Sequence, residues 1–263
     1  MNRIDALFKT LAARHQKAFV AYLVAGDPDL AHTVRLVHSL ERAGVDLIEL
    51  GIPFSDPLAD GLVNQLGAQR ALAAGTTVSG ILSTVEQIRA TSNIPLVLFT
   101  YYNPIFHLGL DEFTRRATAS GVDGALILDL PPEAAAREWP ASDLKRITLI
   151  APTTPVERIR QIAPAASGFI YYISRAGVTG MRDQLPADLA PHIAQIRAAT
   201  PLPVCVGFGV TTPAHAAAVA RLADGVIVGS AIVNRIAQLG PAPDLGEQLR
   251  AFVAPLVQAT HQR

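Results

Sequence analysis

The sequence VDLIELGIPFSDPLADG, residues 45–61, joins an apolar run to a loop rich in proline and aspartate. The apolar part, residues 45–50, predicts a buried parallel strand that carries Glu49 inside it. A buried carboxylate is costly unless it is paired or has a chemical task. Asp60 follows in the loop, eleven residues after Glu49. The two carboxylates could hold different pKa values, as acid and base roles require, or they could be a capped strand end and a solvated turn.

The same alternation of strand and helix continues on both sides of this stretch. Short, apolar, β-branched runs predict strands at residues 19–25, 45–50, 95–101, 122–128, 146–151, 168–173, 203–206 and 225–228. Segments with helical periodicity lie between them, at residues 30–43, 63–74, 78–91 and 110–120, with further helices opening near Thr154, Thr212 and Ser230. The residues 154–157, Thr-Pro-Val-Glu, have the pattern of a capping box with proline at the first helical position.

Eight strand–helix units without a low-complexity linker predict one α/β domain over residues 1–263, a (β/α)8 TIM barrel. An extra amphipathic helix precedes it, because Ile4, Leu7, Phe8 and Leu11 recur at helical spacing. A doubly wound open sheet is the competing fold. Its phosphate-binding glycines normally follow the first strand, and Gly26-Asp27-Pro28 does not match that pattern.

Composition and charge exclude several classes of function. Half of the 263 residues are apolar and the formal net charge is zero, so nothing predicts binding to nucleic acid or to an anionic membrane. No apolar run approaches the ~18 residues of a membrane span, and the charged N-terminus does not resemble a secretory signal. The only cysteine, Cys205, lies in an apolar run and is expected in the core. We therefore expect a soluble, cytoplasmic protein.

In a barrel of this type the chemistry lies where strands end and the following loops begin. Glu49 and Asp60 occupy such positions after the second strand, and the polar, glycine-bearing segment from Ser174 to Gln184 reads as a mobile lid or a long connection. Glycines follow the seventh and eighth strands in Gly207-Phe208-Gly209 and Gly229-Ser230. Bare backbone amides and a helix N-terminus there predict a phosphate site.

The reactive groups that the sequence lacks at strand ends reduce the number of reaction types to consider. The three lysines, Lys9, Lys17 and Lys145, all lie before strands or in the first helix, which disfavours Schiff-base chemistry. The seven histidines show no metal-ligand spacing, so we expect no metal site. No Gly-x-Ser-x-Gly motif is present. The residues alone therefore indicate a barrel enzyme that uses carboxylates on a small phosphorylated metabolite.

Seven motifs, in order along the whole chain, resemble those of the tryptophan synthase α subunit family. They are Gly26-Asp27-Pro28, residues 48–61 (IELGIPFSDPLADG), 100–105 (TYYNPI), 129–133 (DLPPE), 151–154 (APTT), 174–180 (SRAGVTG) and 207–210 (GFGV). The resemblance implies a TIM barrel that cleaves indole-3-glycerol phosphate, by a retro-aldol reaction, to indole and glyceraldehyde 3-phosphate. It also implies that Glu49 is the acid–base catalyst and that Asp60 accepts the indole N–H and stabilises the positive charge that develops there.

The resemblance further implies the remaining site residues and the partner. The phosphate is expected on Gly180, Phe208, Gly209, Gly229 and Ser230, and the indole among Tyr22, Phe99, Tyr101 and Tyr171. Thr179, in the lid, resembles the family residue that bonds Asp60 on closure. The family works as an α2β2 heterotetramer with a β subunit that carries pyridoxal phosphate and uses the indole for L-tryptophan synthesis, so no cofactor is expected on this chain. The segments 53–60 and near Pro131-Pro132 resemble the docking surface.

Two positions depart from the family pattern after Asp60-Gly61. Leu62 stands where proline is usual, and Asn64 stands where an aliphatic residue is usual. Leucine could loosen the loop that carries Asp60, and the amide could perturb signalling between subunits. Three alternatives stay open: a lyase that works alone and releases free indole, a neighbouring phosphate-binding barrel such as the indole-glycerol-phosphate synthase or an isomerase, and a non-catalytic activator of the β subunit. The synthase would need a lysine at the carboxyl end of a strand.

Overall fold

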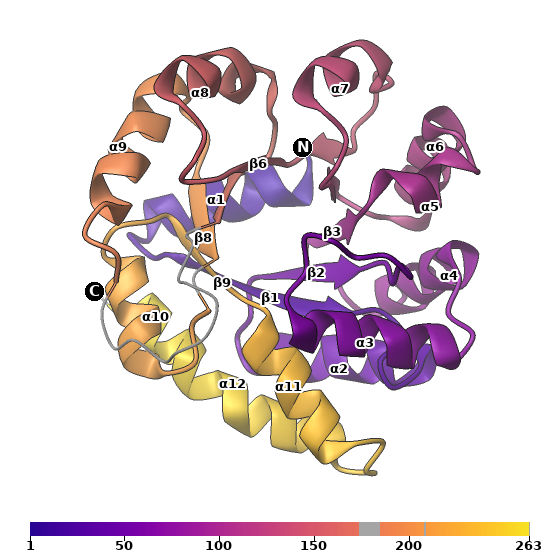
Figure 1. The fold of residues 1–263 in the computed structure, drawn as a ribbon. Helices are drawn as coiled ribbons and strands as arrows, with labels where there is room; N and C mark the ends of the chain where they lie inside the picture. Colours follow the sequence, from indigo (N-terminus) through magenta and orange to yellow (C-terminus); the bar gives the residue numbers. More distant parts are fainter. Residues whose placement is uncertain (174–184, 208, 263) are drawn as a thin grey trace.

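All strands of the described residues belong to one parallel sheet that closes on itself. The computed structural model describes residues 1–173, 185–207 and 209–262. Its strands are β1 (Ala18–Val24), β2 (Leu47–Gly51), β3 (Leu96–Thr100), β4 (Gly124–Ile127), β5 (Lys145–Arg146), β6 (Thr148–Ile150), β7 (Ile170–Ile173), β8 (Val204–Gly207) and β9 (Gly225–Val228). They pair in the order β5-β4-β3-β2-β1-β9-β8-β7-β6. Only Ile147 separates β5 from β6, so the two ends of this order meet within one chain segment and the sheet forms a barrel (Figure 1).

Helices surround the strands (Figure 1). They are α1 (Arg3–Ala13), α2 (Leu30–Arg42), α3 (Leu62–Ala73), α4 (Val78–Arg89), α5 (Tyr102–Phe106), α6 (Leu110–Ser120), α7 (Pro132–Glu138), α8 (Val156–Ile162), α9 (Leu189–Ala199), α10 (Pro213–Ala220), α11 (Ser230–Leu239) and α12 (Leu245–His261). None of the helices within the described residues is both long and apolar enough to pass through a bilayer. The TIM barrel that the sequence predicts, with its extra N-terminal helix, is confirmed.

Of two helix caps predicted from the sequence, one is confirmed and the other is wrong. Thr212 caps α10 as expected, because its hydroxyl accepts a hydrogen bond from the His215 N–H at 3.2 Å. The capping box at residues 154–157 is wrong: Pro155 is the residue before α8, and no side chain caps this helix. The Thr154 hydroxyl instead accepts from the backbone N–H of Ala151 at 3.1 Å and so stabilises the preceding turn.

The core has two layers because strand side chains alternate between the barrel interior and the surrounding helices. On β2, Leu47 packs inside the barrel whereas Ile48 and Leu50 pack against the helices. Glu49 lies between these two and is therefore on the inward face with Leu47.

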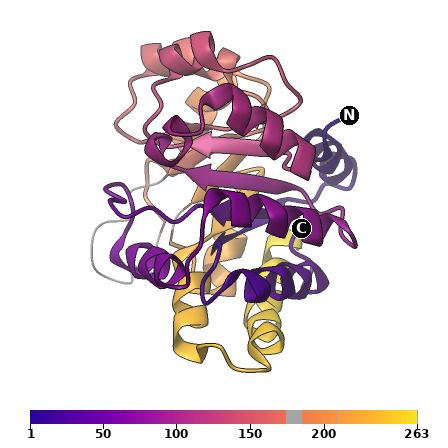
Figure 2. The same ribbon diagram turned by 90° about the vertical axis from the view of Figure 1, so that its right-hand side faces the viewer.

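Helix α1 seals the end of the barrel where the strands begin. Ile4 is fully buried, and the Phe8 ring packs against Phe169 with centroids 5.8 Å apart. Ion pairs fix the helix, from Arg3 to Asp123 at 3.0 Å and from Lys145 to Asp5 at 2.6 Å. Figure 2 shows α1 at the end opposite the loop between β2 and α3. Helix α1 thus covers the amino ends of the strands, and the loops at their carboxyl ends remain for a substrate site.

Helix α3 is fastened to the barrel on its inner side. Arg70 donates two hydrogen bonds, at 2.8 and 2.6 Å, to the buried carboxylate of Asp27, which lies in the turn after β1. A Cβ at Gly67 would lie 2.9 Å from the Val233 side chain, so glycine allows α3 to pack closely on α11. These contacts fix the middle and the last turn of α3 against the barrel and α11.

Candidate active site

Glu49 is a buried carboxyl group without a partner among the described residues. Strand pairing places it level with Tyr22 on β1 and Val97 on β3. Its exposed fraction is 0%, and neither carboxyl oxygen has a hydrogen-bond partner among the described residues. Burial therefore raises the pKa of Glu49 from 4.5 to about 8. At neutral pH this carboxyl group holds a proton that it can deliver into the barrel.

Asp60 lies in a more polar setting. The Tyr101 hydroxyl donates to its Oδ2 at 2.9 Å and accepts from the Ala59 N–H at 3.0 Å, which fixes both the tyrosine and the loop. Gln65 donates to the Asp60 carbonyl oxygen at 2.8 Å. Burial raises the pKa of the Asp60 carboxyl group, and hydrogen bonds from the Tyr101 and Asn64 side chains oppose this rise. Asp60 thus has a donor that stabilises its anion, whereas Glu49 has none within the part of the chain that the structure describes.

A cavity of about 370 Å³ opens at the carboxyl ends of the strands. It is lined by Tyr22, Gly61, Leu62, Val63, Asn64, Phe99, Tyr171, Ile173, Gly207, Gly209, Ile227, Gly229 and Ser230. Tyr22 and Phe99 pack edge to face at 5.3 Å, and Phe99 and Tyr171 lie 6.2 Å apart, so three aromatic rings form one wall.

The charges of both carboxyl groups raise the pKa values of the two tyrosines in this aromatic wall. The pKa of Tyr22 is raised well above its usual value by burial and then by the charges of Asp60 and Glu49. The pKa of Tyr171 is raised by burial, by Glu49 and, more weakly, by Asp60. Neither Glu49 nor Asp60 is among the residues that line the cavity, but both carboxyl groups lie close enough to its aromatic wall for their charges to act on Tyr22 and Tyr171.

Another part of the cavity lining is glycine-rich and suits an anion. Gly209 has φ +65, a left-handed conformation, and a Cβ added there would meet no atom of the described residues within 4 Å. Ser230 is the first residue of α11, a helix of ten residues whose preceding residue, Gly229, offers no capping side chain. The first backbone amides of this helix are left for a bound anion.

The structure brings together six of the predicted binding residues at this cavity: Tyr22, Phe99, Tyr171, Gly209, Gly229 and Ser230. Tyr101 does not line it, but its hydroxyl reaches Asp60. Thr179, Gly180 and Phe208, together with the expected lid, lie outside the described residues. The sequence analysis did not single out Ile173 or Ile227 and treated Asn64 only as a departure. The alternation along β7 and β9 could have identified the two isoleucines as residues at the barrel mouth.

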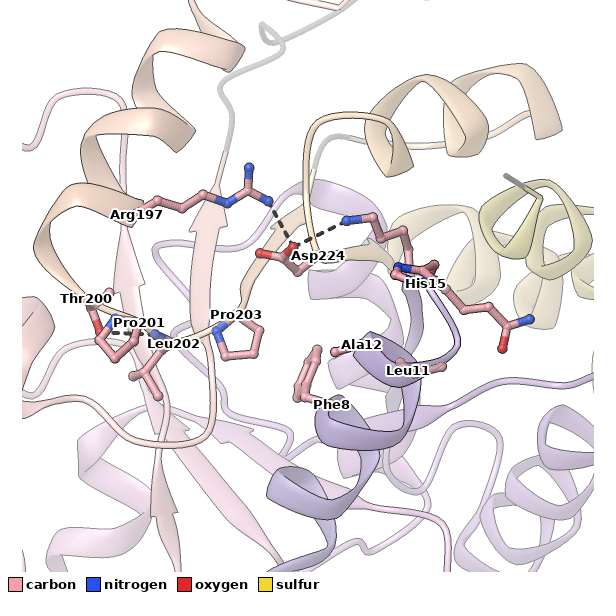
Figure 3. Close-up of a pocket in the computed structure, with 12 residues that line it drawn as sticks. Phe8, Leu11, Ala12, His15, Arg197, Thr200, Pro201, Leu202, Pro203 and Asp224 are labelled. Carbon is pink, nitrogen blue, oxygen red and sulfur yellow. Dashed lines mark hydrogen bonds and ion pairs between the residues drawn. The ribbon is translucent and has the colours of Figure 1, made fainter.

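A second cavity, of about 580 Å³, lies at the other end of the barrel (Figure 3). It is bordered by α1 and by the segments that precede β1, β8 and β9. Its main charged groups bind one another: Asp224 accepts from Arg197 at 2.9 Å and from Lys17 at 3.3 Å, and Figure 3 shows Arg197 extended toward Asp224. The carboxylates of the predicted site are remote from it, so we place the site at the smaller cavity.

Among the described residues, no lysine and no cysteine lines the cavity. All three lysines fall within the described residues: Lys9 on α1, Lys17 ahead of β1 and Lys145 at the start of β5. None is at the carboxyl end of a strand, as the synthase alternative would require. Cys205 is buried inside the barrel. Among the described residues, no three histidine, cysteine, aspartate or glutamate side chains gather as metal ligands would.

The fold and this cavity define a class of protein, the (β/α)8-barrel enzymes with carboxylates at the mouth and a glycine-rich anion site after the last two strands. The family model "Tryptophan synthase alpha chain" matches residues 8–260. The tryptophan synthase alpha chain of Geotalea daltonii is 48% identical over 98% of this chain and 97% of its own length. The chain belongs to the tryptophan synthase alpha chain family.

Solved structures agree with this membership. The alpha subunit of Legionella pneumophila superposes with a TM-score of 0.90 at 41% identity, over 99% of this chain and 98% of that chain. A chain of the α2β2 tryptophan synthase complex of Pyrococcus furiosus superposes with a TM-score of 0.85 at 37% identity, over 92% of this chain and 99% of that chain. The enzyme class expected from the sequence, a lyase that cleaves indole-3-glycerol phosphate in tryptophan biosynthesis, is confirmed by this membership. Alpha chains carry no cofactor, and pyridoxal phosphate belongs to the beta chain.

Proposed function

We propose that this chain cleaves indole-3-glycerol phosphate with Glu49 as the acid–base catalyst and Asp60 as the anion that binds the indole nitrogen. Protonated Glu49 delivers a proton to ring carbon C3, which turns the indole into an electron sink with a positive nitrogen. Asp60 stabilises that charge. The electrons of the breaking carbon–carbon bond flow into the ring, while the Glu49 carboxylate takes the proton of the glycerol hydroxyl. Indole and glyceraldehyde 3-phosphate result, and both the charge and the proton count are restored.

One observation carries this proposal: the two carboxyl groups beside the aromatic wall of the cavity differ in what stabilises their charge. Glu49 has no donor among residues 1–173, 185–207 and 209–262, and burial raises its pKa to about 8, whereas Asp60 accepts a hydrogen bond from Tyr101 at 2.9 Å. Near neutral pH this difference favours one proton donor and one anion, which is the pair that the reaction requires. Paired environments that separate two pKa values are a common feature of acid–base sites.

We assign the two walls of the cavity to the two halves of the substrate. The aromatic wall of Tyr22, Phe99 and Tyr171 suits the flat indole, because aromatic rings pack well edge to face. The glycine wall at Gly209 and Ser230 suits the phosphate, because backbone amides at a helix N-terminus attract anions. In this arrangement the C3 side of the indole would face Tyr22 and the neighbouring Glu49, which is paired with Tyr22 across β1 and β2.

We further propose that the chain, as a single domain, works in an α2β2 heterotetramer with a tryptophan synthase beta chain. Leu58, Leu62 and Leu66 are 94%, 69% and 43% exposed along the loop after β2 and the first turns of α3. Such a run of exposed leucines beside an active-site mouth is typical of a covered interface. It is continuous with the loop that carries Asp60, so docking of the beta chain there would act directly on the position of that carboxylate.

Indole release by the isolated chain, measured with and without a beta chain, tests both parts of the proposal. We expect slow release alone, a strong increase with the beta chain, and loss of both rates in Asp60→Asn. An isolated chain as fast as the complex would favour the stand-alone lyase, and an Asp60→Asn variant that keeps its rate would refute the assignment of Asp60. A chain that speeds the beta reaction but releases no indole in either setting would be a non-catalytic activator.

A further inference from the structure

Tyr22 and Glu49 are neighbours on the inward face of the barrel. They are paired residues of the parallel strands β1 and β2, and Tyr22 belongs to the interior cluster that also contains Leu47. Glu49 is on the same face as Leu47, because side chains two residues apart in a strand point the same way. Neighbouring strands lie about 4.8 Å apart. The Tyr22 and Glu49 side chains therefore leave the sheet side by side.

The Tyr22 ring leans from β1 across β2 at Gly51. A Cβ built on Gly51 would lie 2.8 Å from the Tyr22 Cζ and closer still to its hydroxyl oxygen. The end of the ring thus occupies the space that a side chain at position 51 would need. Gly51 is two residues nearer the carboxyl end of β2 than Glu49, so it shares the inward face. The phenol end of Tyr22 therefore lies on the mouth side of Glu49.

Other contacts hold the Tyr22 ring in this place. Phe99 on β3 packs edge to face against it with centroids 5.3 Å apart, and a Cβ at Gly229, after β9, would lie 3.4 Å from the Tyr22 Cβ and Cδ1. Tyr22 lines the cavity and is 7% exposed, whereas Glu49 does not line it and is 0% exposed. The geometry thus places Tyr22 between the Glu49 carboxyl group and the cavity.

Among the described residues, no charged group accounts for the raised pKa of Glu49. The titratable groups that respond to its charge are Tyr22 on β1, Tyr171 on β7 and Cys205 on β8, and burial raises the pKa of all three, so they are uncharged at neutral pH. Asp60, in the loop after β2, is not among the causes of the shift, and burial is. The pKa of Glu49 therefore depends on the side chains that exclude solvent from it.

We propose that Tyr22 is a positioning residue that closes the barrel between Glu49 and the cavity and keeps solvent from the Glu49 carboxyl group. This inference rests on the proposed function of Glu49 as the proton donor. Gly51 is part of the same arrangement, because the absence of a side chain there leaves room for the end of the ring. A substrate that packs on Tyr22 would then find Glu49 still protonated.

The test compares Tyr22→Ala, which removes the ring, with Tyr22→Phe, which keeps the ring and lacks only the hydroxyl. Ile173→Ala is the matched control, because Ile173 lines the same cavity from β7, which pairs with β6 and β8 rather than with β2. The pKa of Glu49 is measured in the ligand-free chain by NMR of ¹³C-labelled glutamate carboxyl groups, with Glu49→Gln to assign the signal. Circular dichroism verifies that each variant is folded.

We expect Tyr22→Ala to lower the pKa of Glu49 by at least one unit, a tenfold change in its ionisation, because solvent then reaches the carboxyl group. Tyr22→Phe and Ile173→Ala should leave this pKa close to that of the parent chain. An unchanged pKa in Tyr22→Ala would overturn the inference. An equal fall in Tyr22→Phe or in Ile173→Ala would do so as well.

Gly51→Ala tests the same geometry without altering the tyrosine. Its methyl group would displace the end of the Tyr22 ring, so the pKa of Glu49 should fall here too. In the Tyr22→Ala background there is no ring to displace, and Gly51→Ala should cause no further fall. Equal effects of Gly51→Ala in both backgrounds would contradict the role of Tyr22. A Glu49→Gln variant that still releases indole would instead refute the proposed function, and the NMR comparison would still decide the role of Tyr22.

Discussion

Replacing Glu49 with glutamine removes a titrating group while it keeps the volume of the side chain. The rise of its pKa from 4.5 to about 8 reflects the cost of ionising a carboxyl group that is fully buried and unpartnered. At about 1.4 kcal/mol per unit, this rise amounts to about 5 kcal/mol. At a pH where Glu49 is ionised in the unfolded chain, this cost lowers the free energy of unfolding of the wild-type protein. The glutamine variant has no such cost.

The sign of the effect follows from proton binding. Below pH 4.5 Glu49 is protonated in the folded and the unfolded chain, so it costs no stability there. Between pH 4.5 and about 8 the unfolded chain has released the proton and the folded chain has kept it, so stability falls as the pH rises. By pH 7 the loss is about 3 kcal/mol. We therefore expect Glu49→Gln to be more stable than the parent chain at pH 7 and about equally stable near pH 4.5.

Two assays on the same protein check this prediction. Denaturant unfolding at several pH values between 4.5 and 8.5 should show the two free energies of unfolding diverging as the pH rises. Indole release should fall by about 10² to 10⁴-fold in the variant, because general acid–base catalysis is lost, while binding of a substrate analogue is kept. Parallel stability curves would show that the pKa of Glu49 is not raised, and near-normal turnover would refute its catalytic role.

Three further changes test other parts of the site. Gly209→Asp should weaken binding of a phosphorylated substrate analogue at least tenfold more than Gly209→Asn, because only the aspartate adds a negative charge beside the phosphate. Calorimetry measures both affinities, and equal losses would show that the phosphate binds elsewhere. Tyr101→Phe removes the hydroxyl that donates to Asp60 at 2.9 Å. The acid limb of the pH–rate profile should therefore move to higher pH, and kcat/KM should fall about tenfold. An acid limb that does not move would contradict this contact. Asp27→Ala leaves Arg70 on α3 without its ion-pair partner and should lower the free energy of unfolding by about 2 kcal/mol. An unchanged midpoint of urea unfolding would show that this ion pair does not stabilise the helix.

The barrel itself could be predicted because its signal is local. Each strand is buried on both faces, so it appears as a short apolar run, and the observed β2 and β9 fall within one or two residues of the predicted ranges. The irregular parts were missed for physical reasons. The strand expected at residues 146–151 is divided at Ile147, and the short α5 and α7 have too few residues to show a helical period.

From the positions of residues along the chain, we could predict which residues lie at the barrel mouth but not which side chains contact one another there. Glu49 and Asp60 follow the same strand, and the rule for barrel enzymes places both at the mouth. The partners of Asp60 could not be foreseen in the same way. Tyr101 was expected against the indole and donates to Asp60, and Asn64 was expected to disturb subunit signalling and lines the cavity. Such contacts depend on side-chain rotamers and on the phase of α3, which no local pattern specifies.

The pH dependence of kcat/KM for indole release by the isolated chain tests the central claim most directly, namely that one carboxyl group is protonated while the other is ionised. We expect a bell-shaped profile whose alkaline limb lies near pH 8, where Glu49 loses its proton, and whose acid limb reports the ionisation of Asp60 above the usual aspartate value. Glu49→Gln should remove the profile altogether, and Tyr101→Phe should move only its acid limb. Activity that keeps rising with pH beyond 9 would contradict the account, because a deprotonated Glu49 could not deliver the proton to the indole ring.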